Sequence, residues 1–388
     1  MTACIVGWAH SKFGKLEDQD AESLIISAAT DAIKDAGVTP EDIDAIYLGW
    51  YNGGFSKQDF GSSLVMNGID GLRFKPSTRV ENACATGSAA IHQGANYLES
   101  KQGKMVLVVG VEKMTATAGP DVGRILLQAS YIKEEGDVEG GFAGVFGQIA
   151  AGYFQKYGDQ SEALARIAAK NHKNGCENPY AHMRKDLGYE FCRNVSEKNP
   201  FVAGPLKRTD CSMVSDGAAA VVMADVDTAL CMNKAVVFRA RAQANDYLPM
   251  SKRDMTYLGG CAEAWRQAYD KSGLSVKDLS FAETHDCFTI AELMQYEAMG
   301  LVGIGEGGKA INEGWTEKGG KLPINPSGGL KAKGHPIGAT GVSMHVMTAM
   351  QLRGEAEGLQ VKDAQIGGIF NMGGAAVANY VSILEPLR

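Results

Sequence analysis

The stretch Gly334-His-Pro-Ile-Gly-Ala-Thr-Gly341 carries the strongest structural signal in the chain. Its glycines permit tight turns and close backbone approaches, and the proline restricts the backbone beside His335. The stretch therefore predicts a loop that opens a helix and holds a histidine next to room for a substrate.

The end of this stretch recurs elsewhere in the chain. Ala339-Thr-Gly341 repeats Ala85-Thr-Gly87 at an offset of 254 positions, and segment 268–279 resembles segment 32–43 at an offset of 236. The difference between the offsets falls across the glycine-rich stretch 300–320, which is interpreted as an insertion. Two matches in the same order favour an internal duplication over chance. Two similar halves packed together would place a cleft where strand ends and helix N-termini meet.

Short apolar runs alternate with helical patterns along the chain, which predicts an α/β fold. Segment 21–36 is typical of a helix ended by Gly37. Strands are predicted over 43–48, 105–110, 218–224, 365–370 and 377–384, the last two as an antiparallel pair. Residues 115 to 210 fit neither half and indicate an insertion. The predicted domains are an N-terminal half (1–114 plus 208–235), an inserted loop domain (115–207) and a C-terminal half (236–388).

The composition narrows the class of protein. The chain has 388 residues, of which 45% are hydrophobic and 21% charged, as in ordinary globular proteins. The net charge of −7, without a basic patch, speaks against nucleic-acid binding. No apolar run approaches the length of a membrane span, and the start of the chain does not resemble a signal peptide. Eight cysteines without CxxC or zinc-site spacing suit a reducing compartment, so a cytoplasmic location is expected.

Cys84 is the first candidate for chemistry. It lies in Asn82-Ala-Cys84-Ala-Thr-Gly, between a predicted strand and a helix of small residues. A thiol at a helix N-terminus has its pKa lowered by the helix dipole, which favours the nucleophilic thiolate. A buried structural cysteine fits the same position, since cysteine is often buried. The local residues leave both interpretations open.

Three further motifs contain reactive side chains, or glycines whose backbone amides could bind a ligand. His335, held between glycine and proline, suits a base that faces a thiol, or else a structural histidine. In His285-Asp-Cys287-Phe, the imidazole and the thiol share one face of an extended segment, while a capping aspartate beside a buried cysteine fits equally. In Asn371-Met-Gly373-Gly, glycines after the strand 366–370 either point backbone amides at a ligand or form a tight turn.

Taken in order, these four motifs resemble those of the thiolase superfamily, and the resemblance runs from Ile5 to the carboxy terminus. The His285-Asp-Cys287-Phe motif resembles the sterol-carrier-protein type of thiolase and acetyl-CoA acetyltransferases. The resemblance implies the thiolase fold. This fold has two duplicated β-α-β-α-β-α-β-β halves in a five-layered α-β-α-β-α arrangement, with an inserted loop domain that holds coenzyme A. It also implies a homodimer or homotetramer.

The resemblance also implies roles for single residues. Cys84 is the nucleophile, His335 takes its proton, and the backbone amides of Cys84 and Gly373 form the oxyanion hole. Common thiolases carry a second catalytic cysteine where this chain has Asn371, and by resemblance Cys287 replaces it as the acid/base. His285 would then stabilise the enolate oxygen together with His335.

The implied activity is that of an acyl-CoA:acetyl-CoA C-acyltransferase, which performs thiolysis of a 3-oxoacyl-CoA or the reverse Claisen condensation in lipid metabolism. Coenzyme A thioesters are the substrates, with no metal and no other cofactor. Two alternatives remain. One is an acyltransferase or carbon–carbon lyase subunit that acts with a small OB-fold partner protein, and the other is a non-catalytic scaffold of the same fold. Neither a nucleic acid nor a membrane is expected as a partner.

Overall fold

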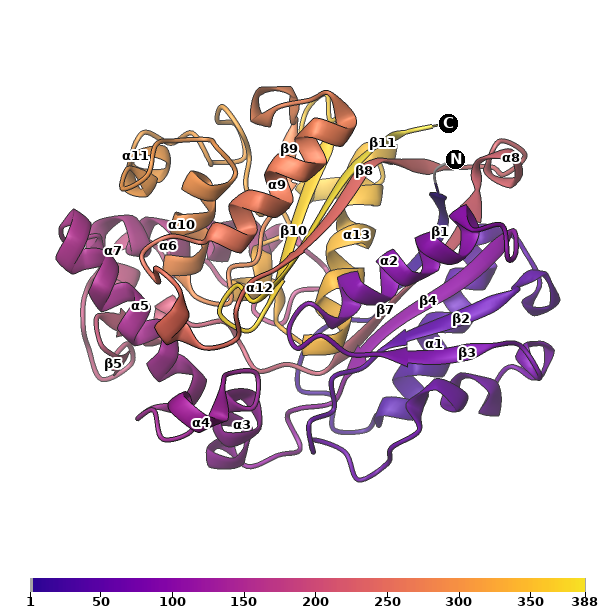
Figure 1. Cartoon of the computed structure of the whole chain (residues 1–388), viewed down its shortest axis with the longest axis horizontal. Helices are drawn as coiled ribbons and strands as arrows, with labels where there is room; N and C mark the ends of the chain where they lie inside the picture. Colours follow the sequence, from indigo (N-terminus) through magenta and orange to yellow (C-terminus); the bar gives the residue numbers. More distant parts are fainter. Residues whose placement is uncertain (1–2, 388) are drawn as a thin grey trace.

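The computed structural model describes residues 3–387 and contains a mixed nine-stranded sheet of order β3-β2-β4-β7-β1-β8-β11-β10-β9 (Figure 1). Its strands are β1 (Ala3–His10), β2 (Ala45–Gly49), β3 (Ser77–Val80), β4 (Met105–Glu112), β7 (Gly217–Asp225), β8 (Val236–Asn245), β9 (Phe281–Glu283), β10 (Gly367–Gly373) and β11 (Ala378–Pro386). A separate hairpin joins β5 (Phe201–Ala203) to β6 (Leu206–Lys207). The α/β prediction is confirmed.

The strand order confirms the duplication. From the centre of the sheet outward, one half runs β1-β7-β4-β2-β3 and the other runs β8-β11-β10-β9. Beyond β9, the described part of the second half continues only as a parallel bridge between Ala282 of β9 and Ile324. This bridge lies in the position that β3 occupies in the first half. Antiparallel pairing of Cys4 with Val237 joins the halves, so the two β layers are the ends of one continuous sheet.

The helices complete the five predicted layers. α1 (Ala21–Ala36) packs on the outer face of the first half-sheet, and α9 (Gly259–Ser272) packs on that of the second. Between the half-sheets lie α2 (Thr86–Glu99) and α13 (Ile337–Arg353), which share a core with strands of both halves. α13 is buried almost all round, as a helix in a central layer must be.

The two central helices touch backbone to backbone where they begin. A Cβ atom on Gly87 would lie 2.7 Å from the amide nitrogen of Val342, and one on Gly341 would lie 2.1 Å from that of Ser88. Only glycine fits such contacts. The repeated Ala-Thr-Gly triplets therefore form the crossing point of α2 and α13, and this crossing brings the loops before both helices to one place.

Local signals explain the predicted ends of α1. The Asp20 side chain accepts a hydrogen bond from the Ser23 amide (2.8 Å), and Gly37 ends the helix at φ 70°. The strand predictions hold to within a few residues. One is too short: β10 continues to Gly373, so Asn371 lies inside a buried strand and not after it. The antiparallel partner is confirmed, since Phe370 pairs with Val381.

The residues between β4 and β7 form helices that pack on the second half. They include α3 (Gly119–Leu127), α4 (Ile132–Glu135), α5 (Gly141–Tyr157), α6 (Ser161–Glu177) and α7 (Tyr189–Arg193). α6 contacts α10 (Thr289–Ala298), α11 (Gly307–Asn312) and α12 (Gly329–Lys333). The predicted domain boundaries stay a prediction.

The remaining helix is α8 (Val226–Ala229), and short 3₁₀ turns lie at Pro40–Asp42, Gly61–Asn67, Asp70–Leu72, Arg208–Asp210, Met250–Lys252, Val276–Asp278 and Glu357–Leu359. Within residues 3–387, none of the helices combines the length and the apolar character that crossing a bilayer requires.

Candidate active site

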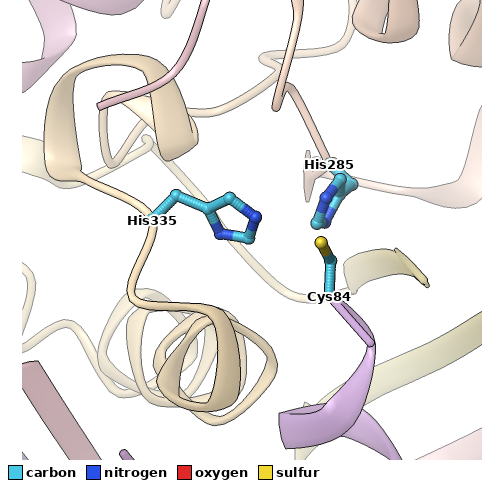
Figure 2. A group of neighbouring side chains, drawn as sticks. All are labelled: Cys84, His285 and His335. Atoms are coloured by element: carbon cyan, nitrogen blue, oxygen red, sulfur yellow. The ribbon is translucent and has the colours of Figure 1, made fainter. Parts of the chain in front are cut away.

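Three predicted residues from distant parts of the chain meet at one buried point. The sulfur of Cys84 and one ring nitrogen each of His285 and His335 lie within 4.8 Å of one another. Cys84 precedes α2, His285 follows β9, and His335 lies between α12 and α13. Figure 2 shows the three side chains directed toward a common centre.

The loop of Cys84 is strained and braced. Ala83 has φ 49°, a left-handed conformation that is unfavourable for a residue with a side chain. Thr86 holds this loop, because its hydroxyl donates to the Ala83 carbonyl (2.6 Å) and accepts from the Asn82 amide (2.9 Å). The Asn82 side chain donates to the hydroxyl of Tyr380 (2.8 Å). These bonds fix the backbone that aims Cys84 at the histidines.

The hydrogen bonds of His335 determine which ring nitrogen carries the proton. The Thr340 hydroxyl donates its only hydrogen to the Pro336 carbonyl (2.9 Å), so it must accept from Nδ1–H of His335 (2.7 Å). In the neutral ring, Nε2 then carries a lone pair and has no partner in residues 3–387. His335 is thus prepared to accept a proton from Cys84.

The side chain of His285 enters the site opposite that of His335. Its ring centroid lies 5.1 Å from that of His335 at an interplanar angle of 85°. Gln295 clamps its backbone, accepting from the His285 amide (2.9 Å) and donating to its carbonyl (2.7 Å). The Asn371 side-chain nitrogen lies 2.9 Å from Nδ1, while Nε2 lacks a partner among the described residues.

The expected lowering of the Cys84 pKa is wrong for this structure. Burial raises the pKa of the thiol to about 12, and the charges of Glu112 and Glu81 add to the effect, while a contact from the Gly374 amide opposes it. Burial, helped by the charge of Lys333, lowers the pKa of His335 to about 3. Burial of the thiol outweighs the helix dipole. The resting pair is therefore a neutral thiol and a neutral imidazole, and the proton must move during attack.

The predicted oxyanion hole has glycines in tight contact with the Cys84 loop. A Cβ atom on Gly373 would lie 2.3 Å from the Asn82 carbonyl oxygen, so the close approach requires glycine. The amide that contacts the Cys84 sulfur belongs to the next residue, Gly374. The assignment of the Cys84 and Gly373 amides as oxyanion donors stays a prediction.

Cys287 lies in the same cavity as Cys84 but outside the trio of converging atoms. Its side chain is buried, and its carbonyl accepts from the Ser212 amide (2.8 Å). Burial and the nearby Cys84 raise the pKa of its thiol well above the ordinary value. Cys287 therefore stays protonated at neutral pH, and its role as acid/base stays a prediction.

A cavity of about 750 Å³ connects this point to the surface. Around Cys84 it is apolar, with Tyr51, Met114 and Ile337 in one cluster. Exposed cationic side chains line its outer part: Lys185, Lys198 and Arg208. No aspartate or glutamate is among the described lining residues. The cavity suits a long ligand that is apolar at the reacting end and anionic at the far end.

The sequence analysis missed two buried groups near the site. Glu112 accepts from the amides of Tyr51 (3.1 Å), Asn52 (3.0 Å) and Gly338 (3.0 Å), and burial raises its pKa to about 7. It ties the first half to the start of α13. The sequence signal for Glu112 was its position as a single acidic residue at the end of an apolar strand. Lys331, 4% exposed, also lines the cavity, and nothing in its local sequence marked it.

Comparisons with known proteins agree with the motifs. The chain matches the family models "Thiolase, N-terminal domain" over residues 3–188 and "Thiolase C-terminal domain-like" over residues 242–386. It is 38% identical over 384 residues to an acetyl-CoA acetyltransferase of Methanothermobacter thermautotrophicus, covering 98% of each chain. It is 34% identical to sterol carrier protein 2 of Bos taurus, over 96% of this chain and 70% of that protein.

The fold is likewise similar to known structures. A solved structure titled "Ltp2-ChsH2(DUF35) aldolase" superimposes with a TM-score of 0.85 at 23% identity, covering 100% of this chain and 98% of that chain. At this identity the likeness supports the fold, and the chemistry must be inferred from the site.

Proposed function

Because the chain belongs to the thiolase family, we propose that it is an acyl-CoA:acetyl-CoA C-acyltransferase working through an acyl thioester on Cys84. One observation carries the proposal. The Cys84 sulfur lies beside two histidine nitrogens that have no other partner in the described residues, one of them a free base. A nucleophile next to an oriented base is the arrangement that covalent acyl transfer requires.

In the thiolytic direction, Cys84 attacks the 3-oxo carbon of a 3-oxoacyl-CoA while its proton passes to Nε2 of His335. The oxyanion is held by the amides of Cys84 and Gly373. The bond between C2 and C3 then breaks, and its electron pair enters the enolate of acetyl-CoA. The enolate oxygen faces His285 and His335. Cys287, protonated because it is buried, donates a proton to C2.

The second half of the reaction restores the enzyme. Coenzyme A gives its thiol proton to the Cys287 thiolate, and its sulfur attacks the acyl carbonyl on Cys84. The tetrahedral adduct releases the Cys84 thiolate, which recovers its proton from His335. Condensation runs through the same steps in reverse. No step leaves a proton or an electron pair unaccounted for.

The outer part of the cavity fits the phosphates of coenzyme A. Lys185, Lys198 and Arg208 are exposed, cationic and close to the opening, and the described lining offers them no carboxylate. Phosphates bind to such groups by charge-assisted hydrogen bonds. Raising the ionic strength should therefore raise the KM for acyl-CoA more than it lowers kcat.

A second candidate function is a carbon–carbon lyase or acyltransferase subunit that needs a small OB-fold partner. The opening of the cavity includes the exposed apolar residues Val202 and Val214, and Phe201 is exposed beside Val202. Apolar side chains at a ligand opening are suited to being covered by a partner. The solved relative's title names an aldolase with a DUF35 protein. Cys84 favours the thiolase, since a lyase has no need of the acylated cysteine.

The proposed assembly follows the family resemblance, and the proposed compartment follows the cysteine pattern. We propose a homodimer or homotetramer in the cytoplasm, where eight free cysteines would stay reduced. Analytical ultracentrifugation of the purified chain distinguishes these oligomers from a monomer.

The function is tested with a panel of 3-oxoacyl-CoAs, from short linear to branched and aromatic, with free coenzyme A. We expect coenzyme A-dependent cleavage of at least one member by the chain alone. Activity that appears only with an added DUF35-type protein would favour the second candidate. Absence of cleavage under both conditions, with no acylation of Cys84, would contradict both enzymatic functions.

A further inference from the structure

We propose that Asn371 is a positioning residue that fixes the ring tautomer of His285, so that Nε2–H donates a hydrogen bond into the active site. The proposal rests on the proposed function, since it assigns His285 a defined role in the same reaction. It also assigns a role to Asn371, which stands where common thiolases carry their second catalytic cysteine.

The assignment follows from two hydrogen bonds of one amide group. The Asn371 side-chain nitrogen lies 3.0 Å from the Cys84 carbonyl oxygen and 2.9 Å from Nδ1 of His285. A carbonyl oxygen only accepts, so the amide group facing it must be NH₂. The second hydrogen of that NH₂ points at Nδ1. An amide nitrogen accepts nothing, and therefore Nδ1 of His285 is the acceptor and Nε2 carries the proton.

The opposite orientation of the amide is unfavourable. It would place the Asn371 oxygen against the Cys84 carbonyl oxygen, with two acceptors about 3 Å apart and no hydrogen between them. In the present orientation that oxygen lies beside Gly341 and has no hydrogen-bond partner among the described residues. Asn371 is fully buried in β10, so no water competes for its bonds. The Cys84 carbonyl thus fixes the orientation of the amide and, through it, the ring.

The two histidines consequently have opposite tautomers. Thr340 makes His335 a base with a lone pair on Nε2, whereas Asn371 makes His285 a donor with a proton on Nε2. A base takes the Cys84 proton and a donor stabilises an oxyanion, so the reaction uses one of each. Swapping the tautomer of His285 would leave two lone pairs, and no histidine N–H toward the substrate until His335 takes the Cys84 proton.

The same swap would change which ligands the site binds. Two imidazole lone pairs and a cysteine sulfur within 4.8 Å of one another form a set that zinc binds. With Nε2 of His285 protonated, that set is incomplete. Asn371 therefore favours an oxyanion over a transition metal at this point, and weakening its hydrogen bond should increase inhibition by zinc.

The direct test is ¹⁵N NMR of the full chain labelled at histidine, which distinguishes the protonated from the bare ring nitrogen. His285 is assigned by the loss of its signals in His285→Asn. We expect a protonated Nε2 and a bare Nδ1 for His285 at neutral pH, and the reverse for His335. A protonated Nδ1 on His285 in the unmodified protein would overturn the proposal, whether or not the protein turns over substrate.

Variants test the cause of the tautomer. Asn371→Ala should give a mixture of His285 tautomers, lower deuterium exchange into the methyl group of bound acetyl-CoA by about 10–100-fold, and increase inhibition by Zn²⁺. Asn371→Asp should shift the ring further toward Nδ1–H. Asn379→Asp is the control, since Asn379 is equally buried on the neighbouring strand and its nitrogen contacts only backbone carbonyls.

The control separates the tautomer from general damage. It should leave the His285 signals and the zinc sensitivity unchanged even if it lowers stability. If Asn371→Ala also leaves the His285 tautomer unchanged, Asn371 is only a packing residue and the proposal fails. A failure of the proposed function would instead show as absent acylation of Cys84 with the expected tautomers in place.

Discussion

Thr86 and Thr340 occupy equivalent positions in the duplicated halves, but their hydroxyls accept hydrogen bonds from different groups. Thr86 opens α2 and Thr340 opens α13, and each hydroxyl donates to a carbonyl in the loop before its helix. In the first half, the hydroxyl accepts from the Asn82 amide and braces the loop of Cys84. In the second half, it accepts from the ring of His335 and fixes the tautomer of that ring.

This difference shows how one duplicated motif yields a two-part site. The first half contributes a strained loop with Cys84, and the second contributes the histidines and Cys287. The glycines of both triplets let the two helix starts touch, so that the differing loops share one cavity. Neither half contains all of these converging side chains by itself. Removing either contribution should therefore affect different steps of the reaction.

The largest effect is expected from the first half. Cys84→Ala should abolish thiolysis, because Cys84 supplies the only sulfur among the converging atoms of the described residues. Steady-state cleavage of the best 3-oxoacyl-CoA measures this loss. Turnover that stays within tenfold of the parent would show that Cys84 is not the nucleophile.

From the second half, Cys287→Ala should spare the transfer of acetyl from acetyl-CoA to the enzyme. It should lower deuterium exchange at the methyl group of bound acetyl-CoA by about 10²–10⁴-fold, the usual effect of removing a positioned proton-transfer group. Mass spectrometry follows both processes. Exchange at the parent rate would make Cys287 a buried thiol and leave His285 as the candidate proton carrier.

The two threonines allow the comparison itself to be tested. Thr340→Val should lower kcat by about 10–100-fold and alter its pH dependence, since His335 loses the acceptor that fixes its tautomer. Thr86→Val should lower stability by about 1 kcal/mol for each lost hydrogen bond. It should also lower kcat through the loosened Cys84 loop, without altering the pH dependence. Kinetics and thermal unfolding are measured for both. Equal changes in the pH profiles would mean that the threonines do not differ in role.

The electrostatic state of the pair determines how Cys84 reacts in the free enzyme. With the pKa of Cys84 raised to about 12 and that of His335 lowered to about 3, the thiolate is scarce at neutral pH. Alkylation by iodoacetamide should therefore accelerate steadily from pH 7 to 10. It should be slower still in His335→Ala. A rate that is already constant between pH 6 and 8 would reveal a preformed thiolate and imidazolium.

A separate effect concerns stability in mild acid. All seven histidines have lowered pKa values in the folded chain, mainly because they are buried. Below the unfolded value of about 6.5, the unfolded chain binds more protons, so stability falls as the pH falls. Glu112 and Asp286, with pKa values raised to about 7, act in the opposite direction.

The seven histidines outnumber these two acids, so lowering the pH from 7 to 5 should lower the free energy of unfolding. Each unbalanced proton changes the free energy of unfolding by about 1.4 kcal/mol per pH unit. Urea unfolding at pH 7, 6 and 5 measures the sum. Stability that increases steadily from pH 7 to 5 would contradict the burial of neutral histidines.

The sequence predicted features whose causes are local. The ends of α1 follow from its cap residues, and the buried strands follow from apolar runs bounded by turns. The order of the four motifs, read by resemblance, predicted the residues that meet around Cys84. The duplication could be found because both triplets retain glycines that the helix crossing requires.

Features that depend on long-range contacts were missed or wrong. The pKa of Cys84 was predicted from its helix, but burial by both halves decides it. The sequence analysis treated Asn371 only as the position of a missing cysteine. Its hydrogen-bond partners, the ring of His285 and the carbonyl of Cys84, lie 86 and 287 positions away along the chain, so no local pattern revealed these bonds. Glu112 gave only a weak signal, since its three partners lie 60 or more positions away.

The central claim is that the two halves act together through an acyl group on Cys84. It is tested most directly by mixing the protein with acetyl-CoA, quenching in acid and mapping the acetyl group by peptide mass spectrometry. The account predicts one acetyl group on the peptide that contains Cys84, slower acetylation in His335→Ala, and none in Cys84→Ala. Acetylation of another residue, or of the Cys84→Ala variant to the same extent, would contradict it.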